Sequence, residues 1–274
     1  MTTLRSTVPL NNGVEMPRLG LGVYQIRAGG SARKAVLSAF EAGYRHIDTA
    51  ALYGNEADVG EAVRESGLPR REVFVTTKLW NSEHGYERTL RACRRSLDEL
   101  GLDVIDLYLV HWPVPRLRKD TWRAMEQLLG DGLCRAIGVS NYMPQHLEEL
   151  LGHARVVPAV NQVELSPFLP QKAVRELCGR HRIVVEAYSP LTRGERLDDR
   201  RLVAIAKRHR KTPAQVLIRW ALEQDLVVIP KSSRRERIVE NANVFDFVLT
   251  PEDLRVLDAL DENLHTDWDP TDAP

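Results

Sequence analysis

The sequence of 274 residues contains few cysteines and no excess of charge of either sign. Its three cysteines, Cys93, Cys134 and Cys178, form no Cys-x-x-Cys pair, which argues against a disulfide framework or a zinc ribbon and is typical of a reducing compartment. The 38 basic residues balance the 38 acidic residues, so no overall attraction to nucleic acid or to an acidic membrane is expected. No apolar run has the length of a membrane span, and the first residues lack the apolar core of a secretion signal. We therefore expect a cytoplasmic protein that binds neither nucleic acid nor membrane.

The sequence also lacks glycine-rich nucleotide-binding motifs and paired metal ligands. Gly20 and Gly22 begin like the glycine-rich fingerprint of a dinucleotide-binding fold, but the third glycine is absent and the pair lies within a predicted strand. The sequence has no P-loop. His46 and His111 lie on different predicted segments, without the paired His-x-His of a metal hydrolase. A dinucleotide would therefore have to bind by another route, and no metal site is predicted.

Strand and helix patterns alternate along the whole chain, without a proline-rich, serine-rich or charged linker between them. Strands are predicted at residues 19–24, 45–48, 73–78, 105–110, 134–139, 159–164, 183–187 and 226–229. Helices are predicted at residues 31–40, 56–66, 84–100, 120–130, 144–151, 171–180, 198–209, 213–224 and 235–242. Eight strands, each followed by a helical pattern, indicate one α/β domain over residues 1–274, a (β/α)8 TIM barrel.

Local signals mark several boundaries of this barrel. Residues 8–16 alternate around Asn12-Gly13, a pair that favours a tight turn with two positive φ angles, so we predict an N-terminal β-hairpin that plugs one end of the barrel. Ser31 is a good N-cap for the first helix. Thr212 and Thr250 each precede a proline, which predicts two further helix starts.

Four ionisable side chains lie at or just beyond the carboxyl ends of three predicted strands. Asp48 ends one strand and Tyr53 follows in its loop, Lys78 ends the next strand, and His111 follows a third. Strand ends of this kind share one face of a barrel. An ordinary Tyr has a pKa of about 10, so we expect Lys78 to stabilise the Tyr53 phenolate, Asp48 to hold Lys78, and His111 to donate a hydrogen bond to a carbonyl oxygen. Singly, a salt bridge or a core imidazole would explain these residues, but together they favour a site that protonates a developing alkoxide.

A proton donor does not reduce a carbonyl group by itself, so the hydride must come from a bound cofactor. Ser140, Asn141 and Gln162 place hydroxyl and amide groups at two strand ends, where they suit a carboxamide. Tyr188 ends the next strand and offers a flat face on which a nicotinamide could stack.

A basic segment follows the last predicted strand and leads into a helix. Lys231, Ser232 and Arg237 combine positive charge, a hydroxyl and a helix N-terminus, a combination that binds phosphate. Arg234 and Arg235 are interpreted as a solvated basic face.

Three segments resemble the motifs of the aldo-keto reductase family, and together they span most of the chain. They are residues 43–50 with Glu56 and Gly60, residues 137–142, and residues 229–232 with Arg237, Glu240 and Asn241. The short loops and residues 244–247 resemble the bacterial branch that includes diketogluconate reductases. The resemblance implies a barrel that binds extended NADPH or NADP+ without a Rossmann domain and transfers hydride to aldehydes and ketones. We expect a monomer acting on a small-molecule carbonyl substrate.

The resemblance also implies roles for individual residues. The catalytic tetrad would be Asp48, Tyr53, Lys78 and His111, with Tyr53 as the general acid. The cofactor would contact Gly22, Val23, Asp48, Ser140, Asn141, Gln162, Tyr188, Ser189, Leu191, Lys231, Ser232, Ser233, Arg237, Glu240 and Asn241. Within that set, Ser189 and Leu191 would lie along the pyrophosphate, Lys231, Ser232 and Arg237 would hold the 2′-phosphate, and Glu240 and Asn241 would meet the adenine.

Aromatic residues near the predicted rim are expected to form the substrate wall. The substrate residues would be Tyr24, Trp80, His111 and Trp112. Trp122 and Trp220 lie inside helical patterns and are predicted to be core residues. Trp268 lies in a tail rich in Asp and Pro, which either folds over the mouth or is disordered.

Two other functions stay open at this point. One is a binding protein on the same barrel, such as a cofactor-sensing subunit that resembles channel-associated members of the family. That role usually needs an exposed partner surface or an extension, and neither is evident in the sequence. The other is a metal-dependent barrel hydrolase, which the spacing of the histidines disfavours.

Overall fold

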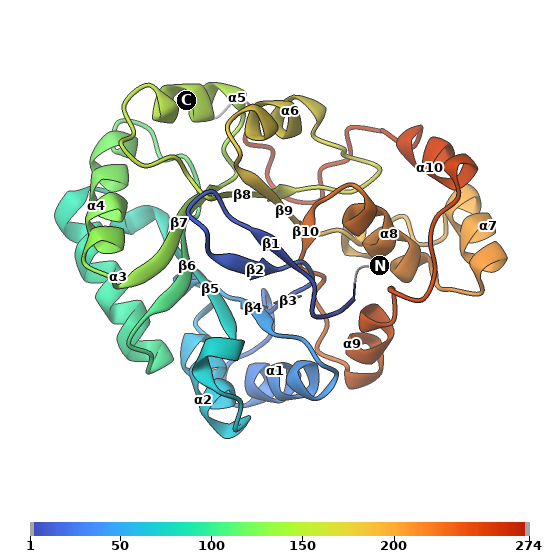
Figure 1. Cartoon of the computed structure of the whole chain (residues 1–274), viewed down its shortest axis with the longest axis horizontal. Helices are drawn as coiled ribbons and strands as arrows, with labels where there is room; N and C mark the ends of the chain where they lie inside the picture. Colours follow the sequence, from blue (N-terminus) through green and yellow to red (C-terminus); the bar gives the residue numbers. More distant parts are fainter. Residues whose placement is uncertain (1–2, 272–274) are drawn as a thin grey trace.

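The computed structural model describes residues 3–271 and contains a ring of eight parallel strands surrounded by helices (Figure 1). The strands follow one another around the ring in chain order. They are β3 (Leu21–Gly22), β4 (His46–Asp48), β5 (Phe74–Leu79), β6 (Ile105–Val110), β7 (Cys134–Ser140), β8 (Val160–Glu164), β9 (Val184–Tyr188) and β10 (Val227–Val228). Parallel bridges from Leu19 to Val228 and from Gly22 to Lys231 close the ring between β10 and β3. The predicted (β/α)8 barrel is confirmed, although its first and last strands are shorter than expected.

Ten α-helices of the described chain surround the strands (Figure 1). They are α1 (Ser31–Glu41), α2 (Glu56–Glu65), α3 (Tyr86–Leu100), α4 (Arg118–Gly130), α5 (Pro144–Leu151), α6 (Lys172–Arg180), α7 (Arg200–His209), α8 (Pro213–Glu223), α9 (Arg235–Ala242) and α10 (Pro251–Asp258). Trp122 of α4 and Trp220 of α8 are buried, which confirms that they belong to the core. None of these helices combines the length and the apolar character needed to cross a membrane.

The predicted helix starts are correct at two of three positions. The Thr212 hydroxyl accepts a hydrogen bond from the backbone of Gln215 at the start of α8, and the Thr250 hydroxyl does the same for Asp253 at the start of α10. Ser31 is not an N-cap, because it is already the first residue of α1 and the cap position belongs to Gly30 at φ 100°. The carboxylate of Asp58, on the neighbouring helix α2, accepts from the Gly30 backbone N–H at 2.9 Å and replaces a local cap.

An N-terminal hairpin crosses one end of the barrel, as expected (Figure 1). It consists of β1 (Thr7–Pro9) and β2 (Glu15–Pro17). The predicted turn with two positive φ angles is wrong, because Gly13 has φ 83° while Asn12 does not adopt a positive φ. The loop is wider, and its asparagine side chains hold it on the barrel. Asn11 donates to the Pro158 carbonyl and Asn12 to the Arg135 carbonyl, each at 2.9 Å.

We predict that Gly60→Ala destabilises the fold because α2 packs against the end of α3 at this glycine. A Cβ at Gly60 would lie 1.8 Å from the carbonyl oxygen of Leu100, so the two helices would have to separate. Overpacking of this kind costs about 1–3 kcal/mol or more, which exceeds the gain of about 1 kcal/mol from the better helix propensity of Ala. Urea unfolding measures the net loss. Gly130→Ala is the matched control, because no atom lies within 4 Å of its added Cβ, and equal stability of both variants would contradict the prediction.

Candidate active site

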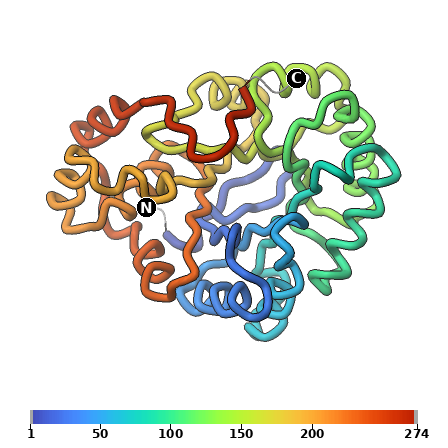
Figure 2. The backbone as a smooth tube through the Cα atoms, turned by 180° about the vertical axis from the view of Figure 1, so that it is seen from behind, coloured from blue at the N-terminus to red at the C-terminus, as the bar shows by residue number. Residues whose placement is uncertain are grey.

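A cavity of about 370 Å³ lies at the carboxyl ends of the strands, opposite the hairpin. The view from this side shows the C-terminal segment passing over the rim of the barrel (Figure 2). Asp48, Tyr53 and His111 line the cavity, together with Gln162 of β8 and residues at or after the ends of β7, β9 and β10. A larger hollow of about 780 Å³, beside the hairpin and α6, contains none of these three residues. The cavity at the carboxyl ends is therefore the candidate site, as this fold favours.

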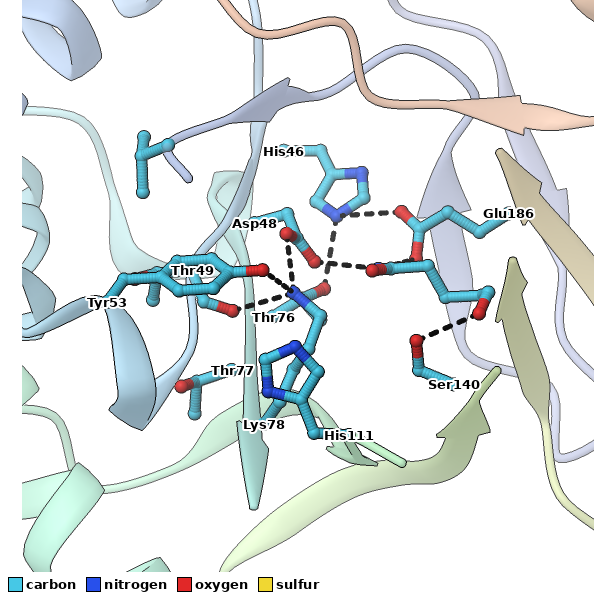
Figure 3. Close-up of polar contacts among 12 residues, drawn as sticks. His46, Asp48, Thr49, Tyr53, Thr76, Thr77, Lys78, His111, Ser140 and Glu186 are labelled. Atoms are coloured by element: carbon cyan, nitrogen blue, oxygen red, sulfur yellow. Dashed lines mark hydrogen bonds and ion pairs between the residues drawn. The ribbon is translucent and has the colours of Figure 1, made fainter. Parts of the chain in front are cut away.

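Asp48, Lys78 and Tyr53 converge at the floor of this cavity (Figure 3). The fully buried Lys78 ammonium donates to Asp48 Oδ1 at 2.6 Å, to the Thr49 carbonyl at 2.9 Å and to the Tyr53 hydroxyl at 3.5 Å. Strand pairing explains the meeting, because Asp48 of β4 lies opposite Thr76 of β5, and Lys78 lies two residues further on the same face of β5. The predicted convergence of these side chains is therefore what the structure contains.

The loop that carries Tyr53 is fixed by a residue that the sequence analysis did not single out. The side chain of Asn55 accepts from the Thr49 hydroxyl at 2.7 Å and donates to the carbonyls of Val23 and Ile26 at 3.1 and 3.0 Å. These bonds tie the loop after β4 to the loop after β3. Tyr53 is thus held at the end of a short 3-10 helix, Ala51–Tyr53, rather than on a free loop.

His111 lies directly after β6 and faces two aromatic rings. Its ring centroid is 5.7 Å from that of Tyr53 and 5.3 Å from that of Trp80, both edge to face. Burial, reinforced by the charge of Lys78, holds the pKa of His111 well below its usual value. The imidazole is therefore neutral at physiological pH and has one N–H to donate, as a group that polarises a carbonyl oxygen requires.

The pKa of Tyr53 is higher than that of a free tyrosine. Burial, followed by the charge of Asp48, raises the pKa of Tyr53 well above its usual value. Lys78 does not reverse this rise, because the ammonium contacts Asp48 at 2.6 Å and Tyr53 only at 3.5 Å. Its role in stabilising the Tyr53 phenolate stays a prediction. Burial also raises the pKa of Asp48, while Lys78 and Gln162 oppose that rise. The phenol therefore stays protonated at neutral pH, which is the form that can donate.

The polar side chains at the end of β7 and within β8 leave acceptor oxygens for a carboxamide. Asn141 donates to the His111 carbonyl and to the Ser140 hydroxyl, at 3.1 and 3.2 Å, and its oxygen accepts from the Tyr188 hydroxyl at 2.9 Å. The amide nitrogen of Gln162 donates to two carboxyl groups, so both of its N–H bonds are used inside the barrel. Gln162 lines the cavity, and no described group donates to its amide oxygen. These residues fit the amide end of a nicotinamide.

The basic segment after β10 divides into two parts. Arg234 and Arg235 are exposed and lie near surface carboxylates, with Arg235 at 3.4 Å from Glu41. Lys231 and Arg237 line the cavity, and neither forms an ion pair with any residue from 3 to 271. Two cations without acidic partners beside the start of α9 fit a bound phosphate group.

Most of the predicted site residues line the cavity. Those that do are Gly22, Tyr24, Asp48, Tyr53, His111, Trp112, Ser140, Asn141, Gln162, Tyr188, Ser189, Leu191, Lys231 and Arg237. Those outside its lining are Val23, Lys78, Trp80, Ser232, Ser233, Glu240 and Asn241. Lys78 lies beneath it against Tyr53, Trp80 reaches the ring of His111, and Glu240 accepts from the Thr212 hydroxyl at 2.8 Å.

Two charged residues of the rim were missed by the sequence analysis. Arg193, in the loop after β9, and Asp267, in the C-terminal segment, form an ion pair and both line the cavity. The next residue, Trp268, packs its ring 5.1 Å from that of Trp112, so the tail folds over the mouth. Glu164 at the end of β8 anchors this tail by accepting from the Thr266 and Asp267 backbones at 2.9 and 3.2 Å.

Comparison with known proteins gives one consistent result. The sequence model described as "Aldo/keto reductase family" matches residues 18–262. A glyoxal reductase of Bacillus subtilis strain 168 is 52% identical over 262 residues, which cover 96% of this chain and 95% of that protein. The crystal structure of MGS-M4, an aldo-keto reductase from a deep-sea metagenome, superposes with a TM-score of 0.95 at 45% identity and covers 97% of this chain and 99% of its own. A variant of Gox0644 in complex with NADPH has a TM-score of 0.93 at 41% identity, with 98% of each chain covered.

Proposed function

Because this chain belongs to the aldo/keto reductase family, we propose that it reduces aldehydes and ketones with NADPH, with Tyr53 as the general acid. The family predicted from the three motifs is thereby confirmed, whereas the branch that includes diketogluconate reductases stays a prediction. The cytoplasmic location and the monomeric state also stay predictions. The observation that carries the proposal is the Tyr53 hydroxyl, 3.5 Å from the buried Lys78 ammonium, in the lining of a cavity that also contains two cations without acidic partners in residues 3–271.

Tyr53, His111 and Lys78 each have a separate role in the proposed reaction. A bound NADPH would supply the hydride to the carbonyl carbon and become NADP+. Tyr53 gives its hydroxyl proton to the carbonyl oxygen, so that the C=O bond becomes CH–OH. The neutral His111 donates a hydrogen bond to the same oxygen and orients it. The Lys78 ammonium, held by Asp48, stabilises the negative charge that remains on Tyr53.

A direct assay tests this function. The purified protein is mixed with NADPH and a panel of small aldehydes, dicarbonyls and ketones, and the loss of NADPH absorbance is followed. We expect NADPH oxidation that depends on the carbonyl compound and yields the corresponding alcohol. Absence of turnover with every compound, together with absence of NADPH binding, would overturn the proposal.

We predict that Arg237→Ala weakens the binding of NADPH much more than that of NADH. The two cofactors differ by one phosphate, and Arg237 lines the cavity without an acidic partner in residues 3–271. Loss of a hydrogen bond to a charged group costs about 1.5–3 kcal/mol, which corresponds to roughly a 10- to 150-fold weaker affinity. Fluorescence titration with each cofactor measures the two dissociation constants.

Arg235→Ala is the matched control for this experiment, because Arg235 lies two residues away on the same helix. It is exposed and close to Glu41, so its loss should change neither affinity. If Arg237→Ala weakened NADPH and NADH equally, its contact would not be with the additional phosphate.

A further inference from the structure

A carboxyl group lies buried in the barrel on the inner side of the tetrad. Glu186, in the middle of β9, is fully buried, and its Oε2 accepts from the amide nitrogen of Gln162 at 2.8 Å. The same nitrogen donates to Asp48 Oδ2 at 2.8 Å. Gln162 therefore links the carboxyl groups of Asp48 and Glu186, and Asp48 holds the ammonium of Lys78. Asp48, Lys78 and Glu186 are labelled in Figure 3.

No cationic side chain among residues 3–271 pairs with Glu186. The ammonium of Lys78 is occupied by Asp48 Oδ1 and the Thr49 carbonyl. The imidazole of His46 lies 3.6 Å from Glu186 Oε1, but burial and the charge of Lys78 lower the pKa of His46 to about 3, so the ring is neutral. Burial, with the negative charge of Asp48, raises the pKa of Glu186 to about 8. At neutral pH the side chain is thus an uncharged carboxylic acid.

The orientation of the Gln162 amide follows from the Asp48 carboxylate. If the amide turned by 180°, its oxygen would face Asp48 Oδ2, and one acceptor would meet another. With both N–H bonds directed inward, the amide oxygen remains for the cavity. The same two bonds hold Asp48 Oδ2, so that Oδ1 stays on Lys78.

We propose that Glu186 is a positioning residue for carbonyl reduction, which acts through Gln162 on both the Asp48–Lys78 pair and the amide oxygen that faces the cofactor. The proposal rests on the proposed function, since it assigns a role in the same site. Glu186 does not line the cavity, so it can act there only through its neighbours. Its uncharged form supplies an acceptor without adding a second negative charge beside Asp48.

Ionisation of Glu186 has a defined consequence for Tyr53. The groups that face Glu186 are His46 and Asp48 of β4, Lys78 of β5 and Gln162 of β8, while β10 places the apolar Val227 opposite it. As the pH rises through the pKa of Glu186, the new negative charge makes Tyr53 harder to deprotonate. A variant without this charge should lose its Tyr53 proton at lower pH.

Glu186→Gln and Glu186→Leu separate the two parts of the proposal. Gln keeps an acceptor oxygen for Gln162 but cannot ionise. We expect near-normal reduction at neutral pH, with the alkaline limb of the kcat/KM profile shifted down by roughly half a pH unit or more. Leu removes the acceptor, and we expect the KM for NADPH to rise about tenfold while kcat also falls, because the Gln162 amide is then held by its bond to Asp48 alone.

A measurement on the protein without cofactor tests the same assignment independently of activity. Infrared difference spectroscopy of the wild type should show a protonated carboxyl band at neutral pH that disappears as the pH is raised through about 8. The band should be absent from Glu186→Gln. Glu164→Gln is the matched control, because Glu164 is also buried but contacts the tail, so it should keep both the band and the wild-type alkaline limb.

The outcomes distinguish this inference from the proposed function. A wild type that oxidises no NADPH with any carbonyl compound overturns the function itself. An active wild type whose Glu186→Gln variant is folded, with an unshifted alkaline limb and the carboxyl band still present, overturns the role of Glu186 alone. If Glu186→Leu does not fold, Glu186→Gln and the infrared spectrum still decide the question.

Discussion

Replacement of Tyr53 by Phe is expected to lower kcat for carbonyl reduction by about 10²- to 10⁴-fold, the usual contribution of a general acid. The substitution removes one hydroxyl and keeps the ring. The ring centroid lies 4.9 Å from that of Tyr24 and 5.1 Å from the Lys78 ammonium. Cofactor contacts are therefore retained. Single-turnover loss of NADPH absorbance measures the chemical step, and a fluorescence titration should give an NADPH dissociation constant close to that of the wild type.

Tyr24→Phe is the control for this prediction, because it removes a second phenol from the wall of the same cavity. Tyr24 has no contact with Lys78, so its loss should lower kcat by less than about tenfold. Retention of a tenth or more of the activity in Tyr53→Phe would show that another group protonates the alkoxide.

Replacement of Lys78 by Met is expected to reduce both activity and stability. Lys78 and Asp48 form an ion pair with almost no exposure, and removal of one partner leaves the other charge without compensation. Breaking a buried pair in this way costs about 3–5 kcal/mol, and each kcal/mol corresponds to roughly 2–4 °C in the melting temperature of a protein of 150–250 residues. A loss of at least about 6 °C should therefore appear in thermal unfolding, accompanied by a kcat reduced by about 10²-fold or more.

The loss of stability in Lys78→Met should depend on pH. Burial already raises the pKa of Asp48 above its usual value, and loss of the opposing ammonium raises it further. A carboxyl group whose folded-state pKa is raised favours the folded state at low pH and loses that contribution as the pH rises through this pKa. Lys78→Met should thus be less destabilised at pH 5 than at pH 8. The double variant with Asp48→Asn should recover stability but not activity; equal stability of single and double variants would contradict the argument.

The positions of the tetrad could be predicted because they depend on chain pattern alone. Asp48 and Lys78 end apolar segments of strand length, and the barrel places all such ends on one face. The direction in which the pKa of Tyr53 shifts could not be predicted, because the shift depends on burial and on whether Lys78 lies nearer to Asp48 or to the phenol. Such differences of about 1 Å are fixed by packing of the whole barrel.

Glu186 could have been found from the sequence, whereas the ion pair at the rim could not. An acid inside the apolar run Val184–Tyr188 is unusual, because a buried carboxyl group needs hydrogen-bond partners, and this is a signal of a polar network. Arg193 and Asp267 are separated by 74 positions, and nothing in either local sequence indicates that they meet. The prediction of the hairpin turn was wrong for a related reason, because the Asn12 side chain donates a hydrogen bond to the distant Arg135 carbonyl.

Strand β8 connects the chemistry of the site to its opening. Gln162 and Glu164 are two positions apart and project to the same side of the strand, the first toward Asp48 and the second toward the tail at Thr266. One strand therefore contacts both Asp48 beneath Tyr53 and the tail that carries Trp268, whose ring packs on Trp112 at the mouth of the cavity. Substitution of Trp268, which follows the residues that Glu164 contacts, should change which molecules enter the cavity without changing the pKa of Tyr53. Substrate selectivity and proton transfer can therefore be engineered separately in this barrel.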